Sequence, residues 1–227
     1  MLVIEHEADS GAAMLGDRAR WHGIDLDVRI PTAKNLPESA AGYDAVLSLG
    51  ASPGVNDPDV GWWLDAHLEL LRDADRRGIP VFGVCFGAQA LSVALGGRVE
   101  RASIPEVGWY TVTTVDPDLI ESGPWLQWHV DCVAAIPPGA TVLAVSPVCV
   151  QAFAVGPHLA VQFHPEVGIA EVTSWSQGDP GGPPSAGTTS EDILARFSAE
   201  ADGARERANR LMDRFLSGAG IIGSDGR

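Results

Sequence analysis

Lysine is nearly absent from this chain. Lys34 is the only lysine among 227 residues, and 15 basic side chains stand against 30 acidic ones, for a formal net charge of −15. A surface of this charge repels nucleic acid and anionic membrane, so both are excluded as main partners. No apolar run approaches the length needed to cross a bilayer, and charged residues rather than a signal peptide follow Met1–Ile4.

Cysteine is also scarce. Cys85, Cys132 and Cys149 include no closely spaced pair, which fits a reducing compartment, and we expect a cytoplasmic protein. Four histidines have no metal-ligand spacing: His6, His22, His67 and His158. We therefore expect no metal and no other cofactor. With 45% apolar residues, the length suits one α/β domain with a large core.

Short apolar runs alternate with helical patterns over the first hundred residues. Strands are predicted at 2–4, 25–30, 43–49 and 79–84, and helices at 14–22, 61–77 and 87–95. This alternation is typical of a parallel sheet flanked by helices. Sites in such sheets lie at the carboxyl ends of the strands, so the loop after 43–49 and the segment after 79–84 are expected to be neighbours.

The pattern changes after Arg98. Strand-like runs at 108–115, 141–146, 148–155 and 159–163 are separated by proline and glycine turns, which predicts a mostly antiparallel portion of sheet. Residues 176–188 are rich in glycine and proline, and we expect a mobile loop without regular structure. An apolar stripe predicts a final helix at 190–217. We expect residues 1–227 to form a single domain.

The stretch Pro80–Gln89 joins an apolar strand to a helix through a cysteine. Its spacing Gly83-x-Cys85-x-Gly87 is the thiol version of the nucleophile elbow. Glycine is needed on both sides because the sharp strand-to-helix turn leaves no room for a side chain. The positive end of the helix then favours the reactive thiolate. The alternative interpretation is a buried cysteine at a strand end.

A second polar pair ends the strand that contains Val161. His164 and Glu166 are two residues apart, which places them on one face at strand spacing. A histidine there can take the proton of a thiol while the carboxylate orients its ring. Taken alone, the pair favours a surface His-Pro-Glu turn, because isolated histidines are common.

Taken together, the motifs at 83–89 (Gly-Val-Cys-Phe-Gly-Ala-Gln) and 162–166 (Gln-Phe-His-Pro-Glu) resemble the class I glutamine amidotransferase family. The segments 105–110, 128–131 and 151–153 resemble it as well, and the likeness is strongest to stand-alone members similar to the glutaminase domain of GMP synthase. It covers roughly residues 40–170. It implies a flavodoxin-like mixed sheet flanked by helices, and hydrolysis of the glutamine side-chain amide through a cysteinyl thioester. The implied roles are nucleophile, base and orienting carboxylate for Cys85, His164 and Glu166.

The resemblance also implies two oxyanion donors. The backbone N–H of Phe86 is one. The family's Gly-Gly-Pro loop reads Gly50-Ala51-Ser52-Pro53-Gly54 in this chain, so the second donor is either Ala51 or Ser52, depending on how the loop is aligned. A Cβ at that point can require a shifted backbone.

Four residues are expected to contact substrate by the same resemblance: Gln89, Gly50, Trp128 and His129. Gln89 lies one helical turn after Cys85, on the same face. The alternatives are a solvent-facing Gln89, and a Trp128 that fills the core beside a surface His129.

Three functions remain compatible with the sequence. The first is a glutamine amidotransferase whose ammonia passes to a separate synthetase chain, because these 227 residues contain no ATP-binding segment. The second is a γ-glutamyl hydrolase or peptidase that acts on γ-glutamyl peptides or amines. The third is a non-catalytic regulatory or binding subunit with the same fold. The side chains in the 50–54 loop restrict its conformations, and we favour an enzyme that works without a partner.

Overall fold

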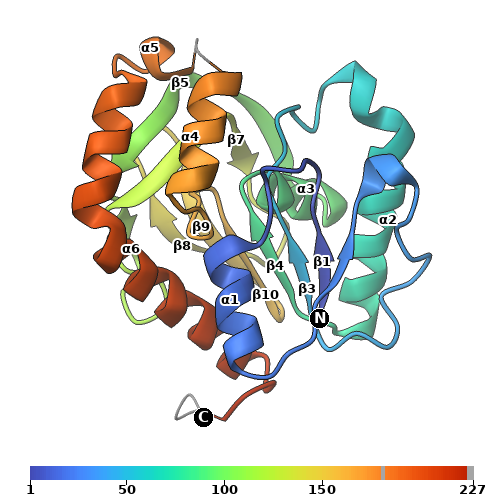
Figure 1. The fold of residues 1–227 in the computed structure, drawn as a ribbon. Helices are drawn as coiled ribbons and strands as arrows, with labels where there is room; N and C mark the ends of the chain where they lie inside the picture. Colours follow the sequence, from blue (N-terminus) through green and yellow to red (C-terminus); the bar gives the residue numbers. More distant parts are fainter. Residues whose placement is uncertain (180–181, 224–227) are drawn as a thin grey trace.

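An eight-stranded mixed sheet forms the centre of the computed structural model, which describes residues 1–179 and 182–223 (Figure 1). In spatial order its strands are β2 (Asp27–Arg29), β1 (Leu2–Ile4), β3 (Val46–Ser48), β4 (Val81–Val84), β10 (His158–Val161), β9 (Val150–Val155), β8 (Thr141–Val145) and β6 (Thr113–Thr114). The strands from β2 to β10 are parallel, and β9, β8 and β6 extend the sheet in antiparallel fashion. This confirms the predicted mixed sheet.

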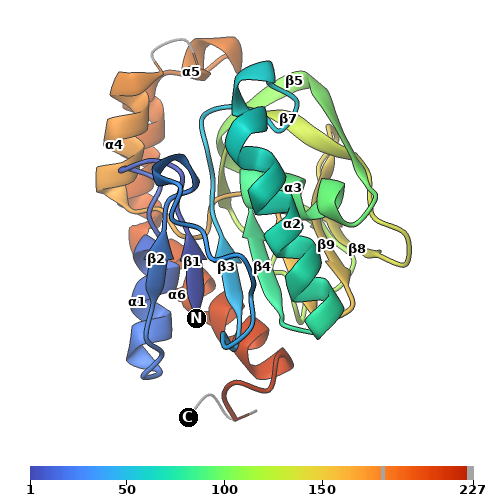
Figure 2. The ribbon, with the colours of Figure 1, turned by 90° about the vertical axis from the view of Figure 1, so that its right-hand side faces the viewer.

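Helices cover both faces of the sheet (Figure 1 and Figure 2). On one face, α1 (Ala13–Trp21) and the C-terminal α6 (Ser190–Gly218) share an apolar cluster with Leu47 of β3. On the other, α2 (Gly61–Arg77) and α3 (Phe86–Ala94) pack with Val46 of the same strand. Successive side chains of a strand point to opposite faces, so β3 contributes to both cores.

A two-stranded antiparallel sheet of β5 (Arg98–Tyr110) and β7 (Trp125–Ala135) lies beside the main sheet. A third apolar cluster joins it to α6 and to α4 (Ile169–Gly178), through Leu126, Val172 and Phe197 among others. Neither β7 nor α4 was predicted. The pattern of β7 is interrupted by the buried polar residues Gln127 and His129, so an alternating strand signal is missing.

The segment 176–188, predicted to be irregular, contains regular structure. Helix α4 reaches Gly178, and a short α5 covers Gly182–Ser185. The Asp179 carboxylate accepts the Gly182 N–H at 2.9 Å, and two prolines follow in the first turn, where their missing N–H groups cost nothing. The prediction of an irregular loop was therefore wrong for these residues, while mobility stays a prediction. Residues 180–181 lie outside the described residues.

The run predicted as one strand at 108–115 is divided between the end of β5, which begins at Arg98, and the separate β6. The other boundaries differ by a few residues. The predicted helix at 61–77 coincides with α2, whereas β2 and β3 are shorter than the runs 25–30 and 43–49. Two single-turn helices, η1 (Pro31–Ala33) and η2 (Pro58–Val60), both begin with proline. Across the part of the chain that the structure describes, no helix has both the length and the apolar composition that crossing a bilayer requires.

Candidate active site

Cys85 stands at the sharp turn between β4 and α3. Its backbone is in a strained region, with φ of 51° and ψ of −108°, and its N–H is held by the Val161 carbonyl at 2.8 Å. A Cβ on Gly83 would stand 2.8 Å from the Gly87 carbonyl oxygen, and one on Gly87 would collide with the Ser48 backbone. Glycine is therefore required at both positions, and the thiol is held at the N-terminus of α3.

His164 and Glu166 follow the end of β10, next to the elbow. His164 Nδ1 lies 2.7 Å from Glu166 Oε1, and both side chains are buried. Burial alone would lower the pKa of His164, but the charges of Glu166 and Cys85, together with their hydrogen bonds, raise it to about 10. The arrangement favours an imidazolium held between a carboxylate and the sulfur.

The ring of His164 is also held by its neighbours. Trp175 of α4 contacts it edge-on, with ring centroids 4.8 Å apart. The Trp175 indole N–H donates to the Asp9 carbonyl at 3.0 Å, which ties α4 to the loop after β1. The backbone N–H of His164 donates to the Leu126 carbonyl of β7 at 2.8 Å. Both α4 and β7 therefore fix the histidine.

A cavity of about 460 Å³ opens above the elbow. Nine of the ten residues named from the sequence line it: Gly50, Ala51, Ser52, Cys85, Phe86, Gln89, Trp128, His129 and His164. Glu166, the tenth, contacts His164 without lining the cavity itself. The structure thus brings the expected residues together, and their roles are taken up under the proposed function.

The 50–54 loop forms one wall of this cavity. A Cβ on Gly50 would lie 3.1 Å from His164 Cε1, so glycine permits the close approach of loop and histidine. Ala51 and Ser52, the two positions where this loop departs from the family's Gly-Gly-Pro, differ in their contacts. The N–H of Ser52 donates to Glu7 Oε1 at 3.3 Å and its hydroxyl to Glu7 Oε2 at 2.7 Å. No hydrogen bond engages the N–H of Ala51 within residues 1–179 and 182–223.

Gln89 is buried rather than solvent-facing. Its amide donates to the Asp131 carbonyl at 3.1 Å and to Gln162 Oε1 at 3.2 Å. His129 is buried too, and its Nδ1 donates to the same Asp131 carbonyl at 3.0 Å. The alternative of a surface His129 is therefore incorrect. The two side chains fix the backbone of β7 where it borders the cavity.

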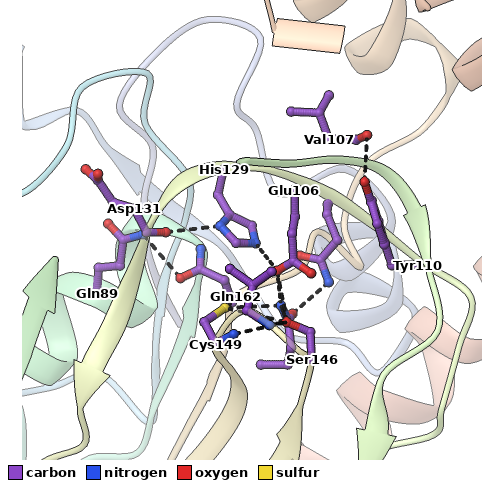
Figure 3. Close-up of polar contacts among 12 residues, drawn as sticks. Gln89, Glu106, Val107, Tyr110, His129, Asp131, Ser146, Cys149 and Gln162 are labelled. Atoms are coloured by element: carbon purple, nitrogen blue, oxygen red, sulfur yellow. Dashed lines mark hydrogen bonds and ion pairs between the residues drawn. The ribbon is translucent and has the colours of Figure 1, made fainter. Parts of the chain in front are cut away.

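A polar cluster behind β7 surrounds Glu106 (Figure 3). Glu106 Oε2 accepts from Gln151 Nε2 at 2.8 Å and from Ser146 Oγ at 3.1 Å, and it lies 3.2 Å from His129 Nε2. Burial would raise the pKa of Glu106, but the hydrogen bond and charge of His129 outweigh it and lower the pKa. The carboxylate is thus stabilised as an anion that supports His129 from behind.

The same cluster contains the residues that could hold a metal. One ligand atom each from Glu106, His129 and Cys149 lies within 4.8 Å of the other two. Burial, followed by the charge of Glu106, raises the pKa of the Cys149 thiol well above its ordinary value, so this thiol keeps its proton in the hydrogen-bonded network. The sequence spacing gave no sign of this group, because its members come from three separate segments.

Sequence reasoning missed four carboxylates that line the cavity: Glu7, Asp9, Asp131 and Asp179. Glu7 and Asp9 directly follow β1, and the rule that sites lie at carboxyl ends of strands could have found them. Asp179 was out of reach, because it follows a helix that was not predicted. Trp175, on the same helix, was missed for the same reason.

Comparison with known proteins gives a consistent picture. The profile of the family described as "Glutamine amidotransferase class-I" matches residues 12–173, which is more than half of the chain. A GMP synthase [glutamine-hydrolyzing] from Limosilactobacillus reuteri is 34% identical over 180 residues, 75% of this chain and 30% of that protein. One from Thermus thermophilus is 42% identical over 98 residues, 40% of this chain and 19% of that protein. The chain spans 19% to 30% of the length of the curated relatives it matches.

Solved structures agree with this assignment along nearly the whole chain. A glutamine amidotransferase from Thermotoga maritima superposes with a TM-score of 0.84 at 25% identity, covering 95% of this chain and 96% of that one. A glutamine amido transferase from Methylobacillus flagellatus has the same fold, with a TM-score of 0.87, 24% identity, and coverage of 96% and 94%. With its fold and sequence profile in agreement, the chain belongs to the class I glutamine amidotransferase family.

Proposed function

We propose that this chain hydrolyses the side-chain amide of glutamine through a thioester on Cys85 and releases ammonia. The observation that carries the proposal is that the strained cysteine elbow and His164 line the same cavity. His164 Nδ1 lies 2.7 Å from Oε1 of the buried Glu166. Membership of the class I glutamine amidotransferase family supports the reaction type.

In the proposed reaction, Cys85 Sγ attacks the amide carbon and forms a tetrahedral intermediate. His164 gives its proton to the amide nitrogen, ammonia leaves, and the thioester forms. His164 then takes a proton from water, which attacks the thioester, breaks the C–S bond to release glutamate, and returns Cys85 to the thiolate beside a protonated His164. Glu166 keeps the ring oriented and stabilises its charged form.

The cavity walls supply the other roles. The N–H groups of Phe86 and Ala51 are the proposed donors to the oxyanion, because the Ser52 N–H is already engaged by Glu7. Gln89, Gly50, Trp128 and His129 are proposed to bind the substrate through the segment that borders the cavity. The ammonia acceptor is proposed to be a separate synthetase, since the curated relatives named GMP synthase extend far beyond the matched region. Three free thiols suit the proposed cytoplasmic location.

A second candidate reaction follows from the charge of the cavity. Four carboxylates line it, those of Glu7, Asp9, Asp131 and Asp179. A γ-glutamyl amine whose leaving group is cationic would find complementary charge there, and a γ-glutamyl hydrolase acting on such amines is therefore proposed as the alternative.

The test is a substrate screen on the purified chain. Glutamine, γ-glutamyl peptides and γ-glutamyl amines are incubated with wild type and with Cys85→Ala, and ammonia or amine release is measured. We expect turnover of glutamine by the wild type alone. Turnover that survives in folded Cys85→Ala would contradict the mechanism. If wild type turns over no compound, while iodoacetamide labels Cys85 no faster than Cys132, the non-catalytic alternative replaces the proposal.

A further inference from the structure

A buried chain of three polar side chains runs beneath the 50–54 loop. His6, which follows β1, lies with Nδ1 3.0 Å from the Gly50 carbonyl oxygen. Its Nε2 is 3.4 Å from Nδ1 of His67 in α2, and His67 Nε2 is 3.0 Å from Ser48 Oγ in β3. The exposed fractions of the three residues are 5%, 0% and 0%. The sequence indicated no role for either histidine.

The partners fix where each proton sits. A backbone carbonyl only accepts, so His6 Nδ1 must carry the hydrogen, and the Nε2 of a neutral His6 is then an acceptor. His67 must donate from Nδ1, which leaves its Nε2 to accept from the Ser48 hydroxyl. Burial, only partly offset by the Gly50 hydrogen bond, lowers the pKa of His6 to about 4. Burial and the neighbouring His6 lower the pKa of His67 as well. Both rings are neutral. Each group therefore donates to the next, from the Ser48 hydroxyl to His67, from His67 to His6, and from His6 to the Gly50 carbonyl.

The hydrogen-bonded series His6–His67–Ser48 fixes the direction of the peptide between Gly50 and Ala51. The peptide is trans, so its C=O and N–H point in opposite directions. His6 packs in the core against Trp63 and Phe86, with ring centroids 5.2 and 4.9 Å away, and it is absent from the cavity wall. Because the Gly50 carbonyl points inward to His6, the Ala51 N–H points away from His6, and Ala51 lines the same cavity as Cys85.

We propose that His6 is a positioning residue, backed by His67 and Ser48, which holds the Gly50 carbonyl inward and thereby aims the Ala51 N–H at the developing oxyanion. The inference rests on the proposed acyl transfer to Cys85. Reversing the peptide would leave the Nδ1–H of His6 buried without a partner. The loop is therefore held in its productive orientation by the chain's own residues, without a second protein.

The experiment compares three variants of His6. In His6→Asn the side-chain amide places a donor close to the position of Nδ1, whereas His6→Leu offers no donor and His6→Gln places one too far along the side chain. Loss of one oxyanion donor costs about 10²–10³ in kcat. We expect His6→Leu and His6→Gln to lose about 10²-fold in kcat with KM changed less than about threefold. His6→Asn should recover most of that loss. If His6→Leu does not fold, His6→Gln supplies the same comparison.

Two alkylating agents separate positioning from general damage. Iodoacetamide alkylates Cys85 by simple displacement and forms no oxyanion, whereas a chloromethyl ketone analogue of glutamine places a carbonyl at the oxyanion donors. We expect His6→Leu and His6→Gln to react more slowly with the ketone only. Equal loss in His6→Asn and His6→Gln, or a parallel loss with iodoacetamide, would overturn the positioning role. Labelling in Cys85→Ala gives the background from the other thiols.

The ring ¹⁵N signals of His6 and His67 test the inference without turnover. We expect both rings to be neutral with the proton on Nδ1, and an Nε2–H tautomer at His6 would overturn the inference even in an active enzyme. If wild type hydrolyses no γ-glutamyl amide but the ketone reaction slows in His6→Leu and not in His6→Asn, the proposed hydrolysis fails and the positioning role stands. A wild type that reacts with neither ketone nor substrate overturns both.

Discussion

His6 and His164 both lie against Gly50 and are nearly equally buried, with 5% and 6% of their surfaces exposed, yet His6 is neutral and His164 is positively charged. The partners of His164 are a carboxylate and a thiol, and its pKa is raised to about 10. The partners of His6 are a backbone carbonyl and a second imidazole, and its pKa is lowered to about 4. The proton on a buried histidine is therefore decided by the charge of its partners.

The two histidines are suited to two different roles within one site, proton transfer and the positioning of the backbone. A charged histidine next to a carboxylate can give and take a proton during the reaction. A neutral histidine that has lost the ability to change charge near pH 7 is suited to holding a backbone group in one direction. Gly50 lies where the two meet, and the absence of a side chain lets His164 approach while His6 holds the carbonyl.

The largest effect is expected from removing the charged histidine. In the proposed reaction, His164→Ala eliminates both the proton donor to the departing ammonia and the base that activates water, and general acid–base catalysis contributes roughly 10²–10⁴. We expect kcat for glutamine to fall by at least about 10³-fold, measured as ammonia release. The matched control is His22→Gln, because His22 binds Asp213 away from the cavity. Retention of a tenth of the wild-type kcat in His164→Ala would point to another base.

Removing only the charge of its partner should have a smaller effect. Glu166→Gln keeps a neutral amide near His164 Nδ1 but removes the carboxylate anion that raises the pKa of His164. We expect the pKa of His164 to fall from about 10 toward 6.5 in an NMR titration, with kcat lowered about 10²-fold. The wild-type histidine, whose folded pKa is raised, stabilises the fold fully below pH 6.5 and loses this contribution as pH rises through about 10. An unchanged titration in Glu166→Gln would contradict this account.

The neutral histidine gives the opposite dependence of stability on pH. Because the folded pKa of His6 is depressed to about 4, the unfolded chain binds its proton first, and stability is lost as pH falls from 6.5 toward 4. Between pH 6.5 and 5 this loss amounts to about 2 kcal/mol. We expect His6→Asn to lack this pH-dependent loss. The measurement is the free energy of unfolding by denaturant of both proteins at pH 6.5 and pH 5. The carboxylates titrate alike in both proteins. Parallel losses in the two proteins would show that His6 titrates normally.

The two halves of this site were not equally accessible from the sequence. The elbow and the His164–Glu166 pair follow local rules of spacing, since strand and helix periods place these residues on fixed faces. Their meeting at one edge followed from the parallel sheet. The His6–His67–Ser48 chain is different, because its members come from the loop after β1, from α2 and from β3, and they meet only after the helix has packed on the sheet. No spacing in the sequence encodes such a contact.

The parts of the fold that were missed have a related cause. Strand β7 carries Gln127, His129 and Asp131, which are polar but largely buried, so its burial pattern does not follow its polarity. Their side-chain partners come from distant segments: Gln127 Nε2 donates to Gln151 Oε1, and His129 Nε2 lies 3.2 Å from Glu106 Oε2. Helix α4 and the short α5 depend on contacts with β5, β7 and α6. Where tertiary contacts satisfy the polar groups, composition alone predicts a loop.

The smallest effect is expected at Trp175, which contacts His164 without changing its charge. Trp175→Phe keeps an aromatic ring near the imidazole, 4.8 Å away in the wild type, but removes the indole N–H that donates to the Asp9 carbonyl. A single hydrogen bond of this kind stabilises by about 1 kcal/mol, and its loss loosens the Asp9 loop that lines the cavity. We expect KM for glutamine to rise about threefold while kcat stays within a factor of about two. Phe197→Leu, a substitution in the apolar cluster beside β5, serves as a control for general loosening. If kcat in Trp175→Phe falls as far as in Glu166→Gln, Trp175 acts on the proton transfer itself, and the charge of the partners is not the sole factor that sets the two histidines apart.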